Sequence, residues 1–223
     1  MHFKLRHLGL IFAISLLFGA ATLWGLTVPG GIRQLAMERY GQRAADSVAE
    51  WEKLIRESRG LAVTEQLAAV NNFFNQHVVW VSDQEAWDVE DYWATPLETM
   101  ARAVGDCEDF SIAKYATLLV MGVDPTSLRM VYVKLKRSGL TQAHMVLAWY
   151  ETPGSTPQIL DNVEYSIMPA TDRGDLIPIF SFNGDAIWAG VRSQPSSADP
   201  LARLSRWRQV LTKMRNEGFE LAP

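Results

Sequence analysis

The stretch Gly105-Asp106-Cys107-Glu108-Asp109 decides the fold, because it begins the helix around which the rest of the chain is expected to pack. Asp106 is a good N-cap and Asp109 lies at the N3 position. The residues that follow, 110–120, are mostly apolar, and Gly122 ends the helix. A helix that is apolar on most sides is predicted to be central and buried.

The only cysteine of the chain, Cys107, stands at the first position of this helix. The carboxylates of Asp106, Glu108 and Asp109 oppose its ionisation, whereas the helix N-terminus favours the thiolate. The Cys107 amide is also an expected oxyanion donor. The helix terminus does not explain why acids crowd a thiol. The three carboxylates act either as simple helix caps or as ligands of a hard cation such as calcium, which binds carboxylate oxygens.

A base for this thiol is sought among four histidines, of which His2 and His7 lie in a leader. His77 is interpreted as structural, near a helix end. His144 lies near the start of a predicted strand, 143–150, and the next strand ends at Asp161. Antiparallel neighbours bring that start and that end together, so Asp161 is expected to orient the imidazole.

The sequence thus predicts Cys107, His144 and Asp161 as a nucleophile, a base and an orienting acid. Each residue also has a structural interpretation: an inert core cysteine, a satisfied core histidine and a turn aspartate.

Elsewhere the pattern predicts helices first and antiparallel strands after, an α+β layout. The acidic stretch 83–91 is interpreted as a solvated loop, and Asn183-Gly184 as a type I′ turn. Thr95-Pro96-Leu97-Glu98 is a capping-box helix start. The expected helices are 32–58, one that Thr64 caps and that ends near 77, one after Thr95, and one from Asp199-Pro200 to about 214. The expected strands are 130–135, 143–150, 158–161, 179–182 and 186–189.

Composition and the N-terminus bound the class of protein. The chain has 223 residues, 48% of them hydrophobic and 21% charged, which fits a globular protein. A net charge of −4 makes nucleic acid an unsuitable partner. Lys4 and Arg6 precede an uncharged run from residue 8 to 26, as in export signals. Residues 1–28 are predicted to be a signal peptide or an uncleaved membrane anchor, and residues 29–223 one domain.

Three blocks of sequence resemble the bacterial transglutaminase-like cysteine proteinases. They are Asp91-Tyr92-Trp93-Ala94-Thr95-Pro96-Leu97-Glu98, Gly105-Asp106-Cys107-Glu108-Asp109-Phe110 and Lys114-Tyr115. The resemblance covers nearly all of the exported part. It implies a papain-like, transglutaminase-type core with Cys107, His144 and Asp161 as the triad. It also implies that Asp106 and Glu108 bind Ca²⁺, with Asp109 a weaker match to a further ligand.

The same resemblance implies a calcium-dependent periplasmic endopeptidase. The expected substrate is the N-terminal region of a large surface adhesin, whose cleavage releases cells from a biofilm. The expected inhibitor is an inner-membrane receptor for cyclic di-GMP, and membrane contact is expected only through the N-terminal segment. Two alternatives remain: an acyl transferase that uses the same triad, and a non-catalytic calcium-binding domain with an inert Cys107.

Overall fold

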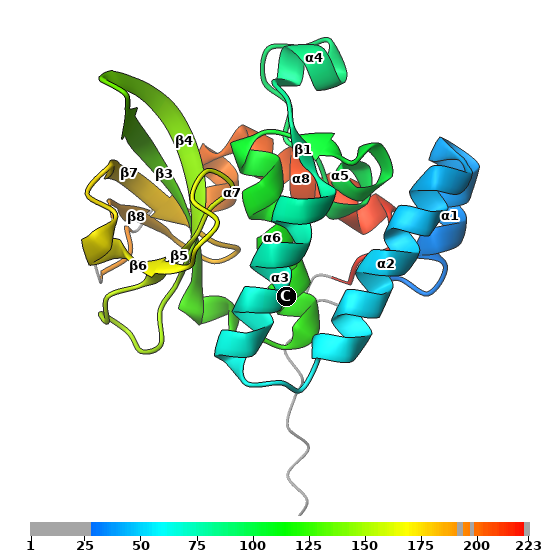
Figure 1. The fold of residues 1–223 in the computed structure, drawn as a ribbon, viewed down its shortest axis with the longest axis horizontal. Helices are drawn as coiled ribbons and strands as arrows, with labels where there is room; N and C mark the ends of the chain where they lie inside the picture. The colour runs from blue at the N-terminus through cyan, green and yellow to red at the C-terminus, as the bar shows by residue number, and fades with distance from the viewer. Residues whose placement is uncertain (1–27, 191–193, 197–198, 221–223) are drawn as a thin grey trace, which may run out of the picture.

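The computed structural model describes residues 28–190, 194–196 and 199–220. The predicted leader, residues 1–28, lies almost wholly outside this part of the chain. Helices pack against one face of an antiparallel sheet, so the α+β prediction is confirmed (Figure 1). Among the helices of the described residues, none is both long enough and apolar enough to cross a membrane.

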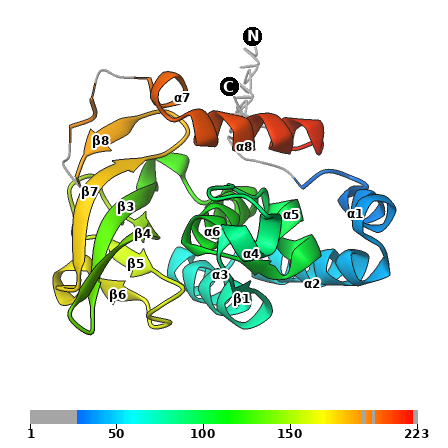
Figure 2. The same ribbon diagram turned by 90° about the horizontal axis from the view of Figure 1, so that it is seen from above.

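Helix α6, Cys107–Met121, lies at the centre of the molecule as expected. Twelve of its fifteen residues are buried, and Gly122 ends it with a left-handed φ of 94°. Figures 1 and 2 both place the six-stranded sheet on one side of α6 and helices α1 and α2 on the other. Residues of all these elements join in one large apolar core.

The N-terminal helices differ from the prediction in two details. The expected helix over 32–58 is broken into α1, Ile32–Tyr40, and α2, Gln42–Ser58, because Gly41 adopts a φ of 86°. Helix α3, Val63–His77, has Ala62 at its N-cap position instead of Thr64, and the carboxylate of Glu65 accepts the Ala62 amide at 3.0 Å.

His77 has the structural place expected for it. Its Nδ1 lies 2.8 Å from the Phe73 carbonyl, one turn earlier in α3, and its ring stacks on Phe73.

The segment between α3 and α6 holds two short helices and two short strands. Helix α5, Pro96–Arg102, begins with the predicted capping box: Thr95 accepts the Glu98 amide and Glu98 accepts the Thr95 amide. Strands β1, Val79–Trp80, and β2, Val104–Gly105, form a parallel pair that the sequence did not reveal. The acidic stretch predicted as a solvated loop contains helix α4, Asp83–Trp87, and is corrected below.

The main sheet has the strand order β6-β5-β4-β3-β7-β8, with every neighbouring pair antiparallel. Its strands are β3 (Leu128–Arg137), β4 (Leu140–Trp149), β5 (Gln158–Leu160), β6 (Met168–Pro169), β7 (Leu176–Phe182) and β8 (Ile187–Ala189). One face packs on α6 through Met130, Met145 and Leu147. The opposite face carries a second apolar cluster that includes Val131, Val146 and Ala148.

Two predictions near the C-terminus were wrong. Neither Asn183 nor Gly184 has a positive φ, so β7 and β8 are not joined by a type I′ turn; the Asn183 side chain instead accepts the amides of Asp185 and Ala186. The last helix is split into α7, Pro200–Arg203, and α8, Ser205–Asn216. Figure 2 shows α8 running along one side of the molecule, and its Trp207 packs edge-on against Tyr115 and Phe182.

Glu217, at the end of α8, provides a test of this packing. Its carboxylate accepts a hydrogen bond from Thr95 at 2.8 Å, and burial raises its pKa to about 7. Because the folded-state pKa is raised, stability is lost as pH rises from the usual value through 7. We expect Glu217→Gln to remove this loss and to stabilise the protein at pH 8 by on the order of 2 kcal/mol.

The measurement is urea unfolding of both proteins between pH 5 and pH 8. If the free energy of unfolding changes with pH in the same way in both proteins, the interpretation of Glu217 as a buried acid with a raised pKa is contradicted.

Candidate active site

Cys107 is the first residue of α6, and the parallel β1–β2 pair fixes the chain that leads into it. The Val81 amide donates to the Gly105 carbonyl at 3.0 Å, and Trp80 is paired with Gly105. Asp106 occupies the N-cap position as expected, but its side chain makes no capping hydrogen bond. The carboxylate therefore does not serve as a helix cap.

The sulfur of Cys107 lies against β4. The Met145 amide donates to it, while the thiol donates to Glu108 Oε2 at 3.0 Å. Burial, reinforced by the charges of Glu108 and Asp106, raises the pKa of Cys107 well above its usual value. In this structure the thiol proton is thus directed to a carboxylate, and the expected opposition of the acids to ionisation is present.

His144 and Asp161 meet in the sheet. Strand β4 starts at Leu140, so His144 lies in the middle of the strand and not near its start as expected. Its Nε2 is 2.8 Å from Asp161 Oδ1, and the residues are 3% and 1% exposed. The β4–β5 register, with Leu147 opposite Leu160, brings them together. Their catalytic roles stay a prediction at this point.

Asp161 is held as a carboxylate by several donors. Burial alone would raise its pKa, but hydrogen bonds from His144, the Val163 amide and Arg173 outweigh burial and hold the pKa well below its usual range. Arg173 is 4% exposed and donates through Nη2 to Asp161 Oδ2 at 2.8 Å. Local sequence reasoning did not find this arginine, because its partner lies 12 residues away across a loop.

Four acids from two segments converge beside Cys107. Single oxygens of Asp83, Asp106 and Asp109 lie within 4.8 Å of one another, and so do atoms of Asp106, Cys107 and Glu108. Asp83 is 4% exposed, so its assignment to a solvated loop was wrong. The acidic residues of 83–91 were the available signal, but their pattern did not match a known calcium loop.

The buried acids share a particular arrangement of their oxygens. Asp83 Oδ2 accepts the Tyr92 amide at 2.6 Å, and Asp109 Oδ1 accepts the Ala94 amide at 2.7 Å. The other oxygen of each, and Asp106 Oδ1, are buried without a hydrogen-bond partner in the described residues. Each of these carboxylates therefore has an unused buried oxygen within the same acidic cluster.

Burial raises the pKa of these groups, and the neighbouring negative charges raise it further. The pKa values reach about 10 for Asp106, about 8 for Asp109 and about 6 for Asp83. Converging buried oxygens with no positive partner are the donor set that a hard divalent cation such as Ca²⁺ requires. The residues present therefore fit the expected cation. Asp83 is added to the predicted Asp106 and Glu108, and Asp109, the weaker match, belongs to the same cluster.

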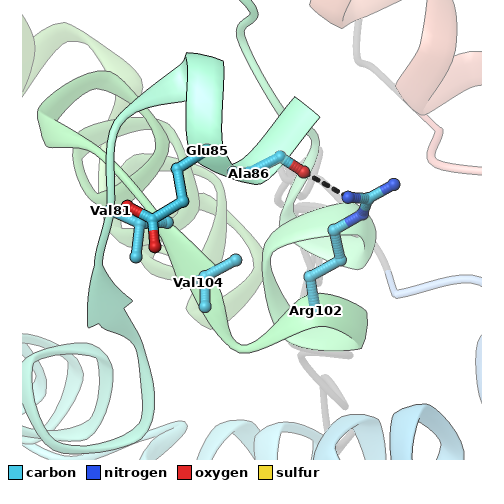
Figure 3. A pocket seen from close by; sticks show the side chains of 5 residues that line it. All are labelled: Val81, Glu85, Ala86, Arg102 and Val104. Carbon is cyan, nitrogen blue, oxygen red and sulfur yellow. Dashed lines mark hydrogen bonds between the residues drawn. The ribbon is translucent and has the colours of Figure 1, made fainter. Parts of the chain in front are cut away.

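Helix α4 is held over β2 by Arg102. Figure 3 shows the Arg102 guanidinium donating to the Ala86 carbonyl across a pocket of about 430 Å³ that Val81, Glu85 and Val104 also line. The guanidinium lies 4.0 Å from the centre of the Trp87 ring. These contacts fix the far end of α4 and so the position of Asp83 at its start.

The chain matches the family described as bacterial transglutaminase-like cysteine proteinase over residues 37–177. This match includes Cys107, His144 and Asp161. The chain belongs to this family. No curated protein sequence matches it significantly.

Two solved structures of Legionella pneumophila LapG are similar to this proteinase. The EGTA-treated form is 37% identical with a TM-score of 0.73, and the match covers 82% of this chain and 95% of that one. The calcium-bound form is 38% identical with a TM-score of 0.72, covering 82% and 97%. The transglutaminase-like fold is thereby confirmed, and LapG itself is a protein with calcium-bound and EGTA-treated forms.

Gly105 gives a geometric test of the acidic cluster. A Cβ at this position would lie 2.7 Å from both Cβ and Oδ2 of Asp109, so only glycine allows the carboxylate to approach. We expect Gly105→Ala to displace Asp109 and weaken calcium binding by about tenfold or more, a cost of about 1.4 kcal/mol.

Isothermal titration calorimetry measures this affinity, and Gly30→Ala is the matched control because a Cβ at Gly30 meets nothing within 4 Å. An unchanged affinity in Gly105→Ala would remove Asp109 from the proposed ligand set.

Proposed function

We propose that this proteinase is a calcium-dependent endopeptidase in which Cys107 is the nucleophile, His144 the base and Asp161 the orienting acid. The observation that carries the proposal is the buried His144–Asp161 pair, whose Nε2 and Oδ1 atoms are 2.8 Å apart. The residue after His144 in β4, Met145, donates its amide to the Cys107 sulfur. Family membership supports peptide hydrolysis over other uses of such a triad.

The chemistry follows from the atoms that are already engaged. Because Asp161 accepts at His144 Nε2, the imidazole keeps its proton there and leaves Nδ1 as the base. Nδ1 takes the thiol proton, and the thiolate attacks the scissile carbonyl to form a tetrahedral intermediate. The amides of the first turn of α6 stabilise the oxyanion. His144 then protonates the leaving amine, and water hydrolyses the acyl-enzyme.

The cation would be held by Asp106 and Glu108, as the resemblance implies, together with Asp83 and Asp109. Such an ion supplies positive charge that neutralises the carboxylates beside Cys107. Glu108 now accepts the thiol proton, and a Glu108 carboxylate engaged as a ligand would leave that proton for His144.

Location, substrate and regulation are proposed from the resemblance. The basic and apolar leader supports export to the periplasm, either free after cleavage or anchored through residues 1–28. There the enzyme would cut the N-terminal region of a large surface adhesin and promote release from a biofilm. An inner-membrane receptor for cyclic di-GMP would inhibit it by sequestration.

The nucleophile is tested with Cys107→Ala. We expect this variant to lose cleavage of a purified N-terminal adhesin segment by at least about a thousandfold while keeping the same thermal unfolding temperature. Gel electrophoresis follows the two fragments. Cleavage that survives in Cys107→Ala would refute the assignment, and incorporation of a labelled amine in place of fragments would identify a transferase.

The cation is tested with Asp83→Asn, since Asp83 is the cluster member that the sequence had placed in solvent. We expect the variant to need at least about tenfold more calcium for half-maximal cleavage, because one charged ligand oxygen is lost. Glu85→Gln, an exposed acid two residues away in α4, should behave like the wild type.

EGTA should inactivate all three proteins, and added calcium should restore them. Activity that is indifferent to EGTA would contradict the calcium requirement.

A further inference from the structure

Arg173 follows a short 3-10 turn, Ala170–Asp172, and its guanidinium lies between two carboxylates. Nη2 donates to Asp161 Oδ2 and to Asp175 Oδ2, both at 2.8 Å, and Nε donates to Asp175 Oδ1 at 2.9 Å. The arginine side chain is 4% exposed, that of Asp161 0% and that of Asp175 37%. Asp175 thus holds the guanidinium from the surface, while Asp161 meets it inside the protein.

The two oxygens of Asp161 are divided between different partners. Oδ1 accepts from His144 at 2.8 Å and from the Val163 amide at 3.0 Å, which leaves Oδ2 to Arg173 alone. Rotation of the carboxylate would break hydrogen bonds on both oxygens. Arg173 therefore fixes the plane of the carboxylate and, through it, the ring of His144.

The main chain of Asp161 is fixed separately. Its carbonyl accepts from Lys114 Nζ at 3.0 Å and from Asn75 Nδ2 at 2.8 Å, so α6 and α3 hold the backbone. These contacts do not set the side-chain angle. Among the described hydrogen bonds, only Arg173 constrains the carboxylate from the side opposite His144.

We propose that Arg173 is a positioning residue of the peptidase: by binding the Asp161 oxygen that His144 leaves free, it keeps the imidazole in the Nε2-protonated form with Nδ1 turned to the reaction. This inference rests on the proposed function, because it assigns His144 as the base. It adds a fourth side chain to the expected three.

Charge supports the same conclusion. A carboxylate with no exposed side-chain surface is costly unless it is paired, and Arg173 is the fixed cation on it. The charged groups around Asp161 are His144 on β4, Arg173, Lys114 on α6, and the nearby Glu164 and Asp175. Removing Arg173 withdraws a favourable charge, so the pKa of Asp161 rises and the acidic limb of the activity profile moves to higher pH. Burial lowers the pKa of Lys114 to about 7, so Lys114 stays charged through the acidic limb and does not contribute to that shift.

The single thiol of the chain makes a test that needs no peptide substrate. The rate at which iodoacetamide alkylates Cys107, followed by mass spectrometry at one fixed calcium concentration, reports how well His144 acts as its base. The variants are Arg173→Met, Arg173→Lys and Asp175→Asn. The last is a milder change, because it removes charge from the second partner of Arg173 but not the Asp161 oxygen that Arg173 binds. His144→Ala gives the rate without a base.

We expect Arg173→Met to slow alkylation and to lower kcat for the adhesin segment by about 10- to 100-fold with little change in KM. Arg173→Lys should recover part of the loss, and Asp175→Asn should lose less than threefold. Nitrogen-15 NMR should show His144 protonated at Nε2 in the wild type and a mixture of tautomers in Arg173→Met.

Arg173→Ala offers a second test that does not depend on a stable methionine variant. Arg173 lines a cavity of about 310 Å³ with apolar residues such as Val133, Val146 and Leu176, so guanidinium ions have room to replace the lost group. We expect millimolar guanidinium to raise the alkylation rate of Arg173→Ala and not that of His144→Ala.

The inference would be overturned if Arg173→Met folds, is alkylated at the wild-type rate, and keeps both the wild-type pH profile and the Nε2-protonated tautomer of His144. A different result is that alkylation slows in His144→Ala and Arg173→Met while the wild type cuts no peptide. That result would refute the proposed function and leave the positioning role standing.

Discussion

Negative charge buried beside a thiol is the constraint on which this structure depends. Asp83, Asp106 and Asp109 each bury an oxygen that no group of the described chain satisfies. A buried acceptor without a partner costs about 1–3 kcal/mol, so three of them represent a large fraction of the stability of an ordinary domain. The fold nevertheless anchors two of these carboxylates through backbone amides, which keeps them within the acidic cluster.

The two halves of the site, the acidic cluster and the His144–Asp161 pair, place carboxylates in opposite environments. Asp161 is surrounded by donors, and the pKa of its carboxyl falls well below the usual range despite burial. Asp106 is buried among other acids, and burial together with their negative charges raises its pKa to about 10. Opposite environments for like side chains allow a single fold to keep one carboxylate ionised and to raise the pKa of another until a cation binds it. The thiol of Cys107 contacts both halves, because it donates to Glu108 and accepts from the amide of Met145, the residue after His144.

How much of this could be predicted depends on how local each signal is. The capping box at Thr95 and the helix that Gly122 ends depend on neighbours within a few residues, and both were predicted correctly. The break at Gly41 was missed, because an apolar stripe continues across it and only the packing of α1 on α2 reveals the turn. The turn at Asn183 was misassigned, because its side chain replaces the backbone geometry that the dipeptide favours.

The candidate site shows the same division. Cys107 and His144 could be found by elimination, since the chain offers one thiol and few histidines, and Asp161 follows from strand order. Arg173 could not, because nothing in its local sequence distinguishes it from a surface residue. Asp83 was missed because the acids around it match no known calcium loop. Only tertiary contacts bury them.

One face of α6 connects the two halves of the site. Cys107, Ser111 and Lys114 follow one another at helical spacing, so they lie on the same side of the helix. The Ser111 hydroxyl donates to the carbonyls of Cys107 and Met145, which joins the first turn of α6 to β4. Lys114 reaches the carbonyl of Asp161. The distance between the thiol and the His144–Asp161 pair is therefore set by a rigid helix face and not by a loop. That rigidity explains why the central, buried helix is also the element that begins with the cysteine.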